Sequence, residues 1–421
     1  CLATVLLSRR LLLQLLEGRT VLATLALTGA LVTCQDIVGW SAGGFETSLI
    51  TTVHLLVMTR IFDPRSRLTP TLLLLATIPL IRGDGVVLWG TEVVALLVTR
   101  GVRRRLLVAA ALTLLPAFGH LLFRHGYYGQ WTPNTYLLKT VGLDHRLLRG
   151  AEYFSRFAHR YSVALALAAL PLIWKAPNWR RCALLGLNLT LAGLYVLTVG
   201  GDNFPGSRFF AHVLPELFIL AAVAITRLAS HPPLSLAAAA AFCWRTAQPL
   251  RWDAIAPISG NGDPYLQVPV AAMLSRYASP QASVGVIAAG IVPYFTGLRS
   301  HDLLGKSDRH IAASPYHPRA AIGHGKVDPA YSFGQVRPDY VVSYRAGSFP
   351  YAVAYQRRIG QLPAGPFDYV AELLGSPEFT ANYLRQPIGT HYLSNVTEIY
   401  VERHSAELAR SRQWRDLPIA P

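Results

Sequence analysis

The sequence predicts a mainly α-helical, polytopic membrane protein with about ten transmembrane or re-entrant helices, followed by a soluble C-terminal α/β domain. Three observations lead to this fold class. Hydrophobic residues make up 52% of the 421-residue chain and charged residues only 15%, whereas a typical soluble domain has about 25% charged residues. Long apolar runs recur up to residue 248 and then stop. Short β-like and helical segments alternate after that point.

The apolar runs define the first predicted domain, residues 1–248. A helix that crosses a bilayer needs about 20 residues, and several of the runs are shorter, so some are expected to be re-entrant. Residues 68–82 and 85–99 are separated by only two residues, which favours a tight hairpin. The runs cover residues 2–16, 20–37, 45–61, 68–82, 85–99, 104–124, 157–174, 181–199, 209–229 and 232–248.

Basic residues concentrate in alternate loops. One set of loops holds 14 Lys and Arg residues and the other set holds 7. The positive-inside rule places the richer set in the cytoplasm, so the other loops and the chain after residue 248 face outward. A net charge of +16 would suit nucleic acid, but this distribution sets membrane orientation instead, and nucleic acid is not expected as a partner. The richer set comprises residues 9–10, 60–67, 100–105 and 175–181, with Arg19 and Arg227.

The second predicted domain, residues 249–421, reads as a small α/β domain outside the cytoplasm. Strands are expected at 283–288, at 339–344 and within 391–403, and a helix is expected at 291–298. Four histidines and two aspartates gather between residues 301 and 324. Their spacing fits no standard set of metal ligands, so a loop is expected there.

The turn Arg82-Gly83-Asp84-Gly85 is the first candidate site. Glycines on both sides of Asp84 let the backbone turn tightly and approach a ligand. Arg82 suits a phosphate, and Asp84 suits a hydroxyl or a divalent cation. The alternative is a plain turn with a surface ion pair, but ionisable residues at membrane level are costly and rarely idle.

The stretch from Gly200 to Arg208 again pairs an acid with an arginine in a turn between two apolar runs. Asp202 is suited to act as a general base or to hold a cation. Arg208 is placed to bind a phosphate at the start of the next helix. The alternative is an ordinary turn in which Asp202 caps a helix. Two such turns on one predicted face favour a functional role.

Three residues of the long loop 124–156 are further candidates for substrate binding. Trp131, Asn134 and Lys139 combine a ring, an amide and an ammonium group, which suits a sugar or a lipid phosphate. An interfacial helix with aromatic and lysine anchors is an equally good interpretation. Glu46, near the predicted outer face, is a last candidate, and helix capping is its alternative role.

Four motifs stand in a fixed order along the outward loops. They are Gly43-Gly44-Phe45-Glu46, Arg82-Gly83-Asp84-Gly85, Tyr128 to Thr135 with Lys139, and Gly200-Gly201-Asp202 with Arg208-Phe209-Phe210. This order resembles that of bacterial membrane glycosyltransferases of the C-type fold. The groups it is most similar to are the terminal arabinofuranosyltransferases of mycobacterial cell walls and the ZomB flagellar-motor-control group. The resemblance spans about residues 35–345.

The resemblance implies a polyprenyl-phosphate sugar donor, such as decaprenyl-phosphate arabinose, and an acceptor outside the cytoplasmic membrane. It implies that a carboxylate activates the acceptor hydroxyl and that basic residues or a divalent cation, Mg or Mn, hold the donor phosphate. Such enzymes carry a key acid in their first outer loop, which here would precede Cys1. We therefore expect an N-terminally truncated chain, and a fragment without its upstream loop is expected to be inactive.

The sequence thus predicts a glycosyltransferase in a bacterial inner membrane, with its C-terminal domain outside and a glycan or protein as acceptor. Asp84 and Asp202 are the predicted catalytic residues, and the identity of any metal is left open. The alternative is a non-catalytic membrane scaffold of an envelope or flagellar-motor system. A transporter is disfavoured, because no repeat is visible and Glu92 is the main acid in the middle of an apolar run. The predicted substrate-binding residues are Glu46, Arg82, Trp131, Asn134, Lys139 and Arg208.

Overall fold

The chain divides into two compact units, each described by itself. The first unit is Cys1–Trp131 with Leu143–Ala256, and the second is Thr132–Gly142 with Pro257–Pro421. The short segment Thr132–Gly142 therefore groups with the second unit, although the sequence analysis assigned it to the membrane domain. The computed structural model describes residues 1–16, 21–42, 45–139, 142–175, 178–202, 207–247, 263–317, 323–344, 368–386 and 397–412.

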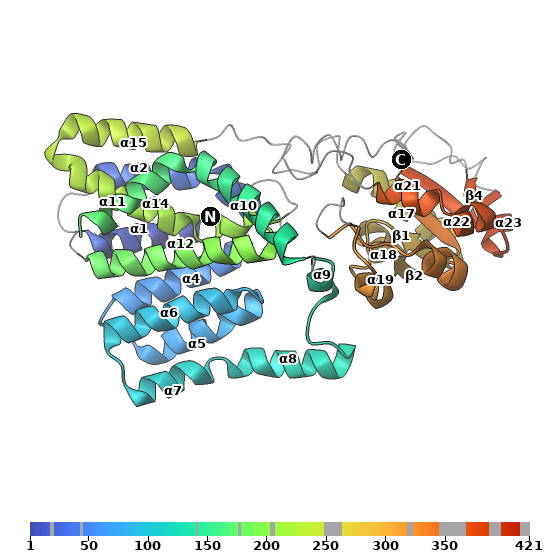
Figure 1. The fold of residues 1–421 in the computed structure, drawn as a ribbon, viewed down its shortest axis with the longest axis horizontal. Coiled ribbons are helices and arrows are strands. Elements are labelled where there is room, and N and C mark those ends of the chain that lie inside the picture. Colours follow the sequence, from blue (N-terminus) through green and yellow to red (C-terminus); the bar gives the residue numbers. More distant parts are fainter. Residues whose placement is uncertain are drawn as a thin grey trace. The chain divides into compact units, whose positions relative to one another are not determined.

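The first unit is helical throughout its described residues (Figure 1). The short helix α9, Asn134–Leu137, belongs to the second unit. The helices of the first unit are α1 Leu2–Leu15, α2 Val21–Thr33, α3 Gln35–Ala42, α4 Thr47–Phe62, α5 Leu68–Ile81, α6 Gly85–Arg100, α7 Arg104–Leu112, α8 Leu115–Tyr128, α10 Leu143–Arg160, α11 Ser162–Ile173, α12 Trp179–Val199, α13 Arg208–Ala211, α14 Leu214–Arg227 and α15 Pro232–Thr246.

Helix α14 is the central element of this unit. Every residue from Leu214 to Ile225 is buried, because α1, α2, α11, α12 and α15 all pack against it. A helix that is apolar on all sides is stable only when it is surrounded. Its sequence is therefore explained by neighbouring helices rather than by lipid.

The prediction of about ten membrane spans is wrong for the part of the chain that the structure describes. Two helical segments are long and apolar enough to cross a membrane, Arg104–Tyr128 and Trp179–Val199, and the bent pair α2–α3 would make a third. The other apolar helices are shorter, as α4, α5 and α11 illustrate. A 14-residue helix such as α5 rises only about 21 Å, against a hydrocarbon core of about 30 Å. Many of the apolar runs are instead explained by burial inside the helical bundle.

The segment Arg104–Tyr128, which contains α7 and α8, is the most exposed apolar part of the first unit (Figure 1). No residue of α8 is buried, and Leu115, Phe118 and Phe123 are each more than half exposed. Arginines stand at its start and the exposed rings of Tyr127 and Tyr128 at its end. This arrangement is typical of a helix that meets a bilayer.

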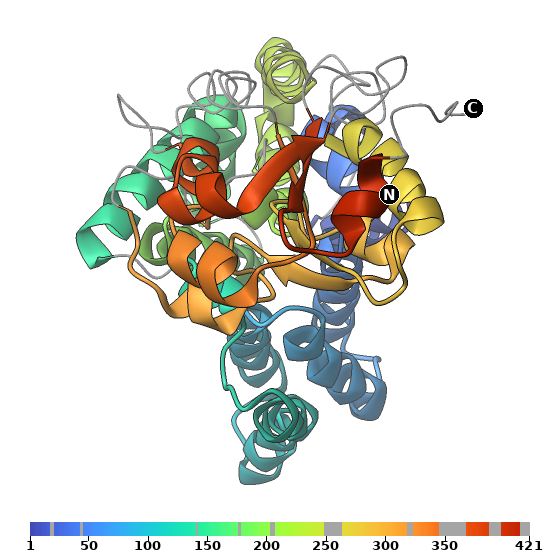
Figure 2. The ribbon, with the colours of Figure 1, turned by 90° about the vertical axis from the view of Figure 1, so that its right-hand side faces the viewer.

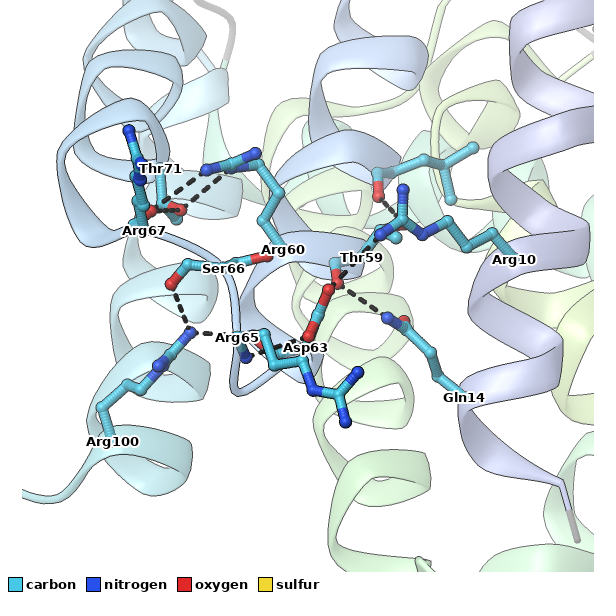
Figure 3. A network of polar contacts seen from close by, with 11 residues as sticks. Arg10, Gln14, Thr59, Arg60, Asp63, Arg65, Ser66, Arg67, Thr71 and Arg100 are labelled. Carbon is cyan, nitrogen blue, oxygen red and sulfur yellow. Dashed lines mark hydrogen bonds and ion pairs between the residues drawn. The ribbon is translucent and has the colours of Figure 1, made fainter.

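Arginine side chains hold the loop between α4 and α5, which the sequence assigned to the cytoplasm (Figure 3). Arg100, at the end of α6, donates to the backbone carbonyls of Pro64 at 2.8 Å, Asp63 at 2.9 Å and Ser66 at 3.0 Å. Arg10 of α1 pairs with the Asp63 carboxylate at 3.4 Å. Arg100 thus satisfies carbonyls that no helix ladder pairs, and Arg10 adds an ion pair to the same loop. Both arginines therefore have a structural role besides any role in orientation.

The second unit confirms the α/β character predicted for the C-terminal region. Its sheet has the strand order β2-β1-β3-β5-β4. Strand β1 is parallel to β2 and β3, whereas β5 is antiparallel to β3 and β4. The strands are β1 Ser283–Val286, β2 Arg299–Asp302, β3 Tyr340–Tyr344, β4 Tyr383–Gln386 and β5 Thr397–Glu402, and the helices besides α9 are α17 Asp263–Tyr277, α18 Ile291–Thr296, α19 Arg309–Ala313, α21 Tyr369–Leu374, α22 Pro377–Asn382 and α23 Glu407–Arg412, with a π-helical turn at Ala330–Val336.

Helices cover both faces of this sheet (Figure 2). Alternate residues of β3 point to opposite faces, as strand geometry requires: Val342 packs with α17, and Val341 packs with the aromatic cluster around Phe333 and Phe379. The strands predicted at 283–288 and 339–344 and the helix predicted at 291–298 are present, each somewhat shorter at its ends. Of the strand region predicted at 391–403, β5 is found, and residues 391–396 lie outside the described residues.

Candidate functional site

The turn between α5 and α6 is built around an arginine–aspartate fork. Arg82 Nε donates to Asp84 Oδ1 at 2.8 Å, and Arg82 Nη2 donates to Asp84 Oδ2 at 2.6 Å. Glu46 lies at the edge of this pair, with its Oε1 3.7 Å from Arg82 Nη1. The turn is so tight that a Cβ at Gly85 would lie only 2.6 Å from the carbonyl oxygen of Ile78. The predicted site residues of this turn therefore meet one another.

The fork controls the ionisation of Asp84, which lies in the turn outside both helices. Burial opposes the charged form, but the hydrogen bonds and the charge of Arg82 outweigh it and lower the pKa of the Asp84 carboxyl. Burial acts against the Arg82 cation too, and Asp84 outweighs it, so the pKa of Arg82 is raised. Asp84 is therefore a carboxylate at neutral pH, and a weak base for as long as Arg82 holds it.

The second acid/arginine turn contains the same pairing. Arg208 Nε lies 2.5 Å from Asp202 Oδ2, and both side chains are largely buried. The Arg208 guanidinium also lies over the rings of Trp40 and Phe45, at 5.8 and 5.5 Å from their centroids. This aromatic surround favours a cation. Gly201 adopts φ +75°, and a Cβ there would lie 2.7 Å from the ring of Tyr153.

Phe209 joins the two turns into one site. Its ring centroid lies 5.7 Å from the Arg82 guanidinium and 5.5 Å from that of Arg208. Phe45 and Glu46 are adjacent in sequence, and each contacts one of the two arginines. The structure thus brings together the sequence-predicted residues Glu46, Arg82, Asp84, Asp202 and Arg208.

A small pocket adjoins the first turn. About one water molecule would fill it. Asp84 forms part of its wall, so a small polar group in the pocket would meet this carboxylate. The other residues that line it are Val87, Leu88, Thr91, Asn188, Ala192, Tyr195 and His212.

The candidates from the long loop are not brought to this site as a group. Trp131 belongs to the first unit, where its half-exposed ring stacks on His125 at 4.1 Å. Asn134 and Lys139 belong to the second unit, where α9 packs against α19. The stacked, exposed ring agrees with the interfacial-anchor interpretation of Trp131.

Asp36 is a buried acid that the sequence analysis did not count as a site residue. Its Oδ1 lies 3.1 Å from Arg160 Nη2, and its Oδ2 accepts from the Tyr161 hydroxyl at 2.8 Å and the Ser207 backbone N–H at 3.1 Å. Asp36 therefore fixes the backbone immediately before Arg208. The one feature of the sequence that could have indicated a role for Asp36 is its position as an acid at the end of an apolar run.

A second group that the sequence analysis missed lies inside the bundle. His54 Nδ1 is 2.7 Å from Glu92 Oε1, and His54 Nε2 is 3.0 Å from Glu216 Oε1. Asn188 Nδ2 donates to the same Glu216 oxygen at 2.9 Å. The three ionisable side chains are fully buried. Each stands alone in its own apolar run, so nothing in the sequence indicates that they meet.

Two histidines of the second unit, His301 and His310, are engaged in hydrogen bonds and ion pairs. His301 Nε2 lies 3.1 Å from the Ser332 hydroxyl, and His301 Nδ1 lies 3.5 Å from Asp308. His310 pairs with Asp328 at 2.8 Å. Ser332 is fully buried, so this serine is not accessible to a substrate. Among the described residues, no group of three or more His, Cys, Asp or Glu side chains is arranged to hold a metal ion.

Comparison with known proteins gives one match. A family model described as a domain of unknown function (DUF8728) matches residues 261–400, about a third of the chain, within the second unit. No curated protein and no solved structure matches the chain.

Proposed function

We propose that the protein is a membrane glycosyltransferase that moves a sugar from a polyprenyl-phosphate donor to an acceptor on the outer face of a bacterial cytoplasmic membrane. The observation that carries the proposal is the pair of acid/arginine turns that share the ring of Phe209. Transfer from a lipid phosphate needs cations for the phosphate and a carboxylate for the acceptor hydroxyl. The two turns supply both groups side by side.

The proposed division of roles follows from the surroundings of each group. Arg208 lies over aromatic rings that suit an isoprenoid or a sugar as well as a cation. Asp84 borders the pocket and is placed to accept the proton of a hydroxyl. A donor phosphate that binds Arg82 would weaken its fork with Asp84 and raise the basicity of this carboxylate. Donor binding would thus make the Asp84 carboxylate a stronger base for the acceptor hydroxyl. A sugar such as arabinofuranose, a glycan or protein acceptor and a divalent cation, Mg or Mn, remain part of the proposal.

The exposed segment Arg104–Tyr128 supports the placement in a membrane. Its helical length of 25 residues corresponds to about 37 Å, more than the hydrocarbon core of about 30 Å. The arginines at its start favour the cytoplasmic side, and the rings of Tyr127, Tyr128 and Trp131 favour an interface at its other end. In the proposed topology the acid/arginine turns and the C-terminal domain lie on the outer side.

A non-catalytic scaffold of an envelope or flagellar-motor system is the second candidate. The observation that favours it is that Asp84 and Asp202 are both held by arginines in the structure. Buried ion pairs of this kind also serve to fix one arrangement of helices. In a scaffold, neither carboxylate would need to act on a hydroxyl.

A transfer assay separates the two candidates. Membranes that contain the protein would be supplied with labelled decaprenyl-phosphate arabinose. Asp84→Asn should lower transfer about 100-fold or more, because a positioned base contributes roughly 10²–10⁴-fold. Asp63→Asn is the matched control, since Asp63 pairs with Arg10 in the loop between α4 and α5. Equal transfer by Asp84→Asn, Asp202→Asn and the wild type would reject the enzyme and favour the scaffold.

A further inference from the structure

The buried cluster of His54, Glu92, Glu216 and Asn188 has a composition that the proposed transfer reaction does not explain. Its side chains come from α4, α6, α14 and α12, in that order. Two carboxyl groups and one imidazole are enclosed there with no exposed surface. Ionisable groups at such positions are expensive and are usually retained for a function.

The contacts set a minimum number of protons for the cluster. Both ring nitrogens of His54 face a carboxylate oxygen, at 2.7 and 3.0 Å. The contact to Glu216 lacks good hydrogen-bond geometry, but two lone pairs at this distance would still repel each other. A hydrogen must therefore stand in each contact, on the ring or on the carboxyl group. These two protons leave the cluster with a net charge of −1, since two carboxyl groups share one imidazole.

Among the residues that the structure describes, no cation in contact with the cluster balances this charge. His212, beyond the cluster, interacts with His54, and its other charged neighbours are Arg82 and Asp84, which neutralise each other. Helices α2, α5 and α11, which pack against α4 or α14, carry no titratable side chain. Glu92 interacts electrostatically with His54 and Glu216, and not with the titratable groups described on the other packed elements. These groups are Arg9 and Arg10 on α1, Asp36 on α3, Arg60 on α4, Arg100 on α6, Arg104 and Arg105 on α7, Asp144, His145, Arg146, Arg149, Glu152, Tyr153, Arg156, His159 and Arg160 on α10, Arg180, Arg181, Cys182 and Tyr195 on α12, Arg208 on α13, Arg227 on α14, and Cys243 and Arg245 on α15.

We propose that Glu92 binds a third proton, so that the cluster is a neutral proton-binding site in the core of the helical unit. Glu216 accepts from Asn188 and is suited to remain ionised beside the His54 cation. Glu92, by contrast, receives no amide donor: its Oε1 faces His54, and its Oε2, like that of Glu216, has no hydrogen-bond partner among the described residues. Glu92 is therefore the acid to which we assign the proton. Protonation removes an uncompensated charge from an environment where such a charge costs several kcal/mol or more.

The pocket beside Asp84 gives this site a route to water. Thr91, the residue before Glu92, and Asn188, which bonds Glu216, both line that pocket. A water molecule there would stand between the turn at Asp84 and the buried cluster. The site therefore takes its proton from water: the carboxylate of Glu92 accepts H⁺ from hydronium and releases one water molecule.

Infrared spectroscopy of the full chain in detergent micelles tests the proposal. A protonated carboxylic acid has a carbonyl stretch that a carboxylate lacks. At pH 7 the wild type should show this band, Glu92→Gln should lose it, and Glu46→Gln should retain it, because Glu46 is partly exposed at the turn. A difference spectrum between wild type and Glu92→Gln that contains only carboxylate bands would overturn the proposal.

Two further measurements keep the test decisive. If Glu92→Gln fails to fold, ¹³C-labelled glutamate in the wild type identifies the same band by its isotope shift, and its absence at pH 7 would refute the proton site. Thermal unfolding in sodium and in choline buffers at equal ionic strength should give the same midpoint. A higher midpoint in sodium alone would mean that a sodium ion, not a proton, balances the charge. None of these measurements uses a sugar donor, so their outcome is independent of the proposed transfer function.

Discussion

The acid/arginine turns and the buried cluster place the same kind of residue in opposite electrostatic situations. In the turns, Asp84 and Asp202 each have an arginine within 2.6 Å, and the pairs are neutral. In the cluster, Glu92 and Glu216 share one imidazole. A carboxyl group with its own cation stays ionised, whereas a surplus carboxyl group in the interior takes up a proton. Burial alone does not decide the charge of an acid; its partners do.

The largest expected effect comes from removing an acid that several donors share. Asp36→Ala would leave Arg160, the Tyr161 hydroxyl and the Ser207 amide without their common acceptor. Loss of one partner of a buried pair costs about 3–5 kcal/mol. We expect a lower midpoint of thermal unfolding in detergent, followed by circular dichroism. Asp63→Asn, at an exposed pair, should cost less than about 1 kcal/mol; equal losses in both variants would contradict the account.

The cluster should respond unequally to changes of its two carboxyl groups. Glu216→Gln removes the ionised partner of His54, and a hydrogen bond to a charged group contributes about 1.5–3 kcal/mol. Glu92→Gln replaces a neutral acid by a neutral amide of the same shape, so it should change the unfolding midpoint much less. The measurement is thermal unfolding of both variants at pH 7. A larger loss in Glu92→Gln would reverse the proton assignment.

The backbone before Asp202 offers a steric test of the second turn. Gly201→Ala would place a methyl group 2.7 Å from the Tyr153 ring at a φ of +75°. Strain and overpacking of this kind cost about 1–3 kcal/mol. Gly39→Ala is the control, since a Cβ there meets no atom within 4 Å. The unfolding midpoint should fall in the first variant only, and an unchanged midpoint in Gly201→Ala would show that the turn adapts.

The smallest effect is expected in the second unit, at Asp339. Burial opposes its charged form, but hydrogen bonds from Ser405 and Ser283 outweigh this and lower the pKa of the Asp339 carboxyl. Because the folded-state pKa lies below the unfolded value of about 3.9, its stabilisation is present above about pH 4 and is lost as the pH falls through the folded-state pKa. Asp339→Asn should speed hydrogen exchange in peptides that contain β1 at pH 7, relative to wild type.

The same comparison at pH 3 provides the check on sign. The difference between wild type and Asp339→Asn should shrink there, because the wild type loses this stabilisation as the pH falls below the unfolded-state pKa of about 3.9, whereas the amide does not titrate. A difference that persists or grows at pH 3 would mean that the carboxylate charge is not the stabilising feature.

From the sequence one could predict that the side chains of the acid/arginine turn at residues 82–85 meet, but not that those of the buried cluster do, and the reason is their separation along the chain. The glycines, Asp84 and Arg82 lie within four consecutive residues, so local spacing predicts that they meet. His54 and Glu92 are 38 positions apart, and helix packing alone brings them together. Asn134 and Lys139 were grouped with Trp131 because they are neighbours in the chain, yet the segment 132–142 belongs to the second unit.

The number of spans was overestimated because hydropathy does not distinguish lipid from protein as a neighbour. Apart from Glu216, helix α14 is apolar on all sides up to Ile225, and other helices surround it. Helix α8 is also rich in apolar residues but has no buried residue. In the C-terminal domain the apolar β-like runs predicted β1, β3 and β5. Strands β2 Arg299–Asp302 and β4 Tyr383–Gln386, which are polar in sequence, were not predicted.

Binding of a lipid phosphate tests the central claim, that the acid/arginine turns form a donor site, most directly. Decaprenyl phosphate would be titrated into the full chain in nanodiscs, for the wild type, Arg208→Lys and Arg10→Lys. Arg208→Lys keeps a positive charge beside Asp202 but loses the planar guanidinium group, which can bind a phosphate through two N–H groups. Arg10 is the control, because it lies at the loop between α4 and α5. The account predicts binding about ten times weaker or more for Arg208→Lys and unchanged for Arg10→Lys. Equal affinity of all three proteins would contradict it.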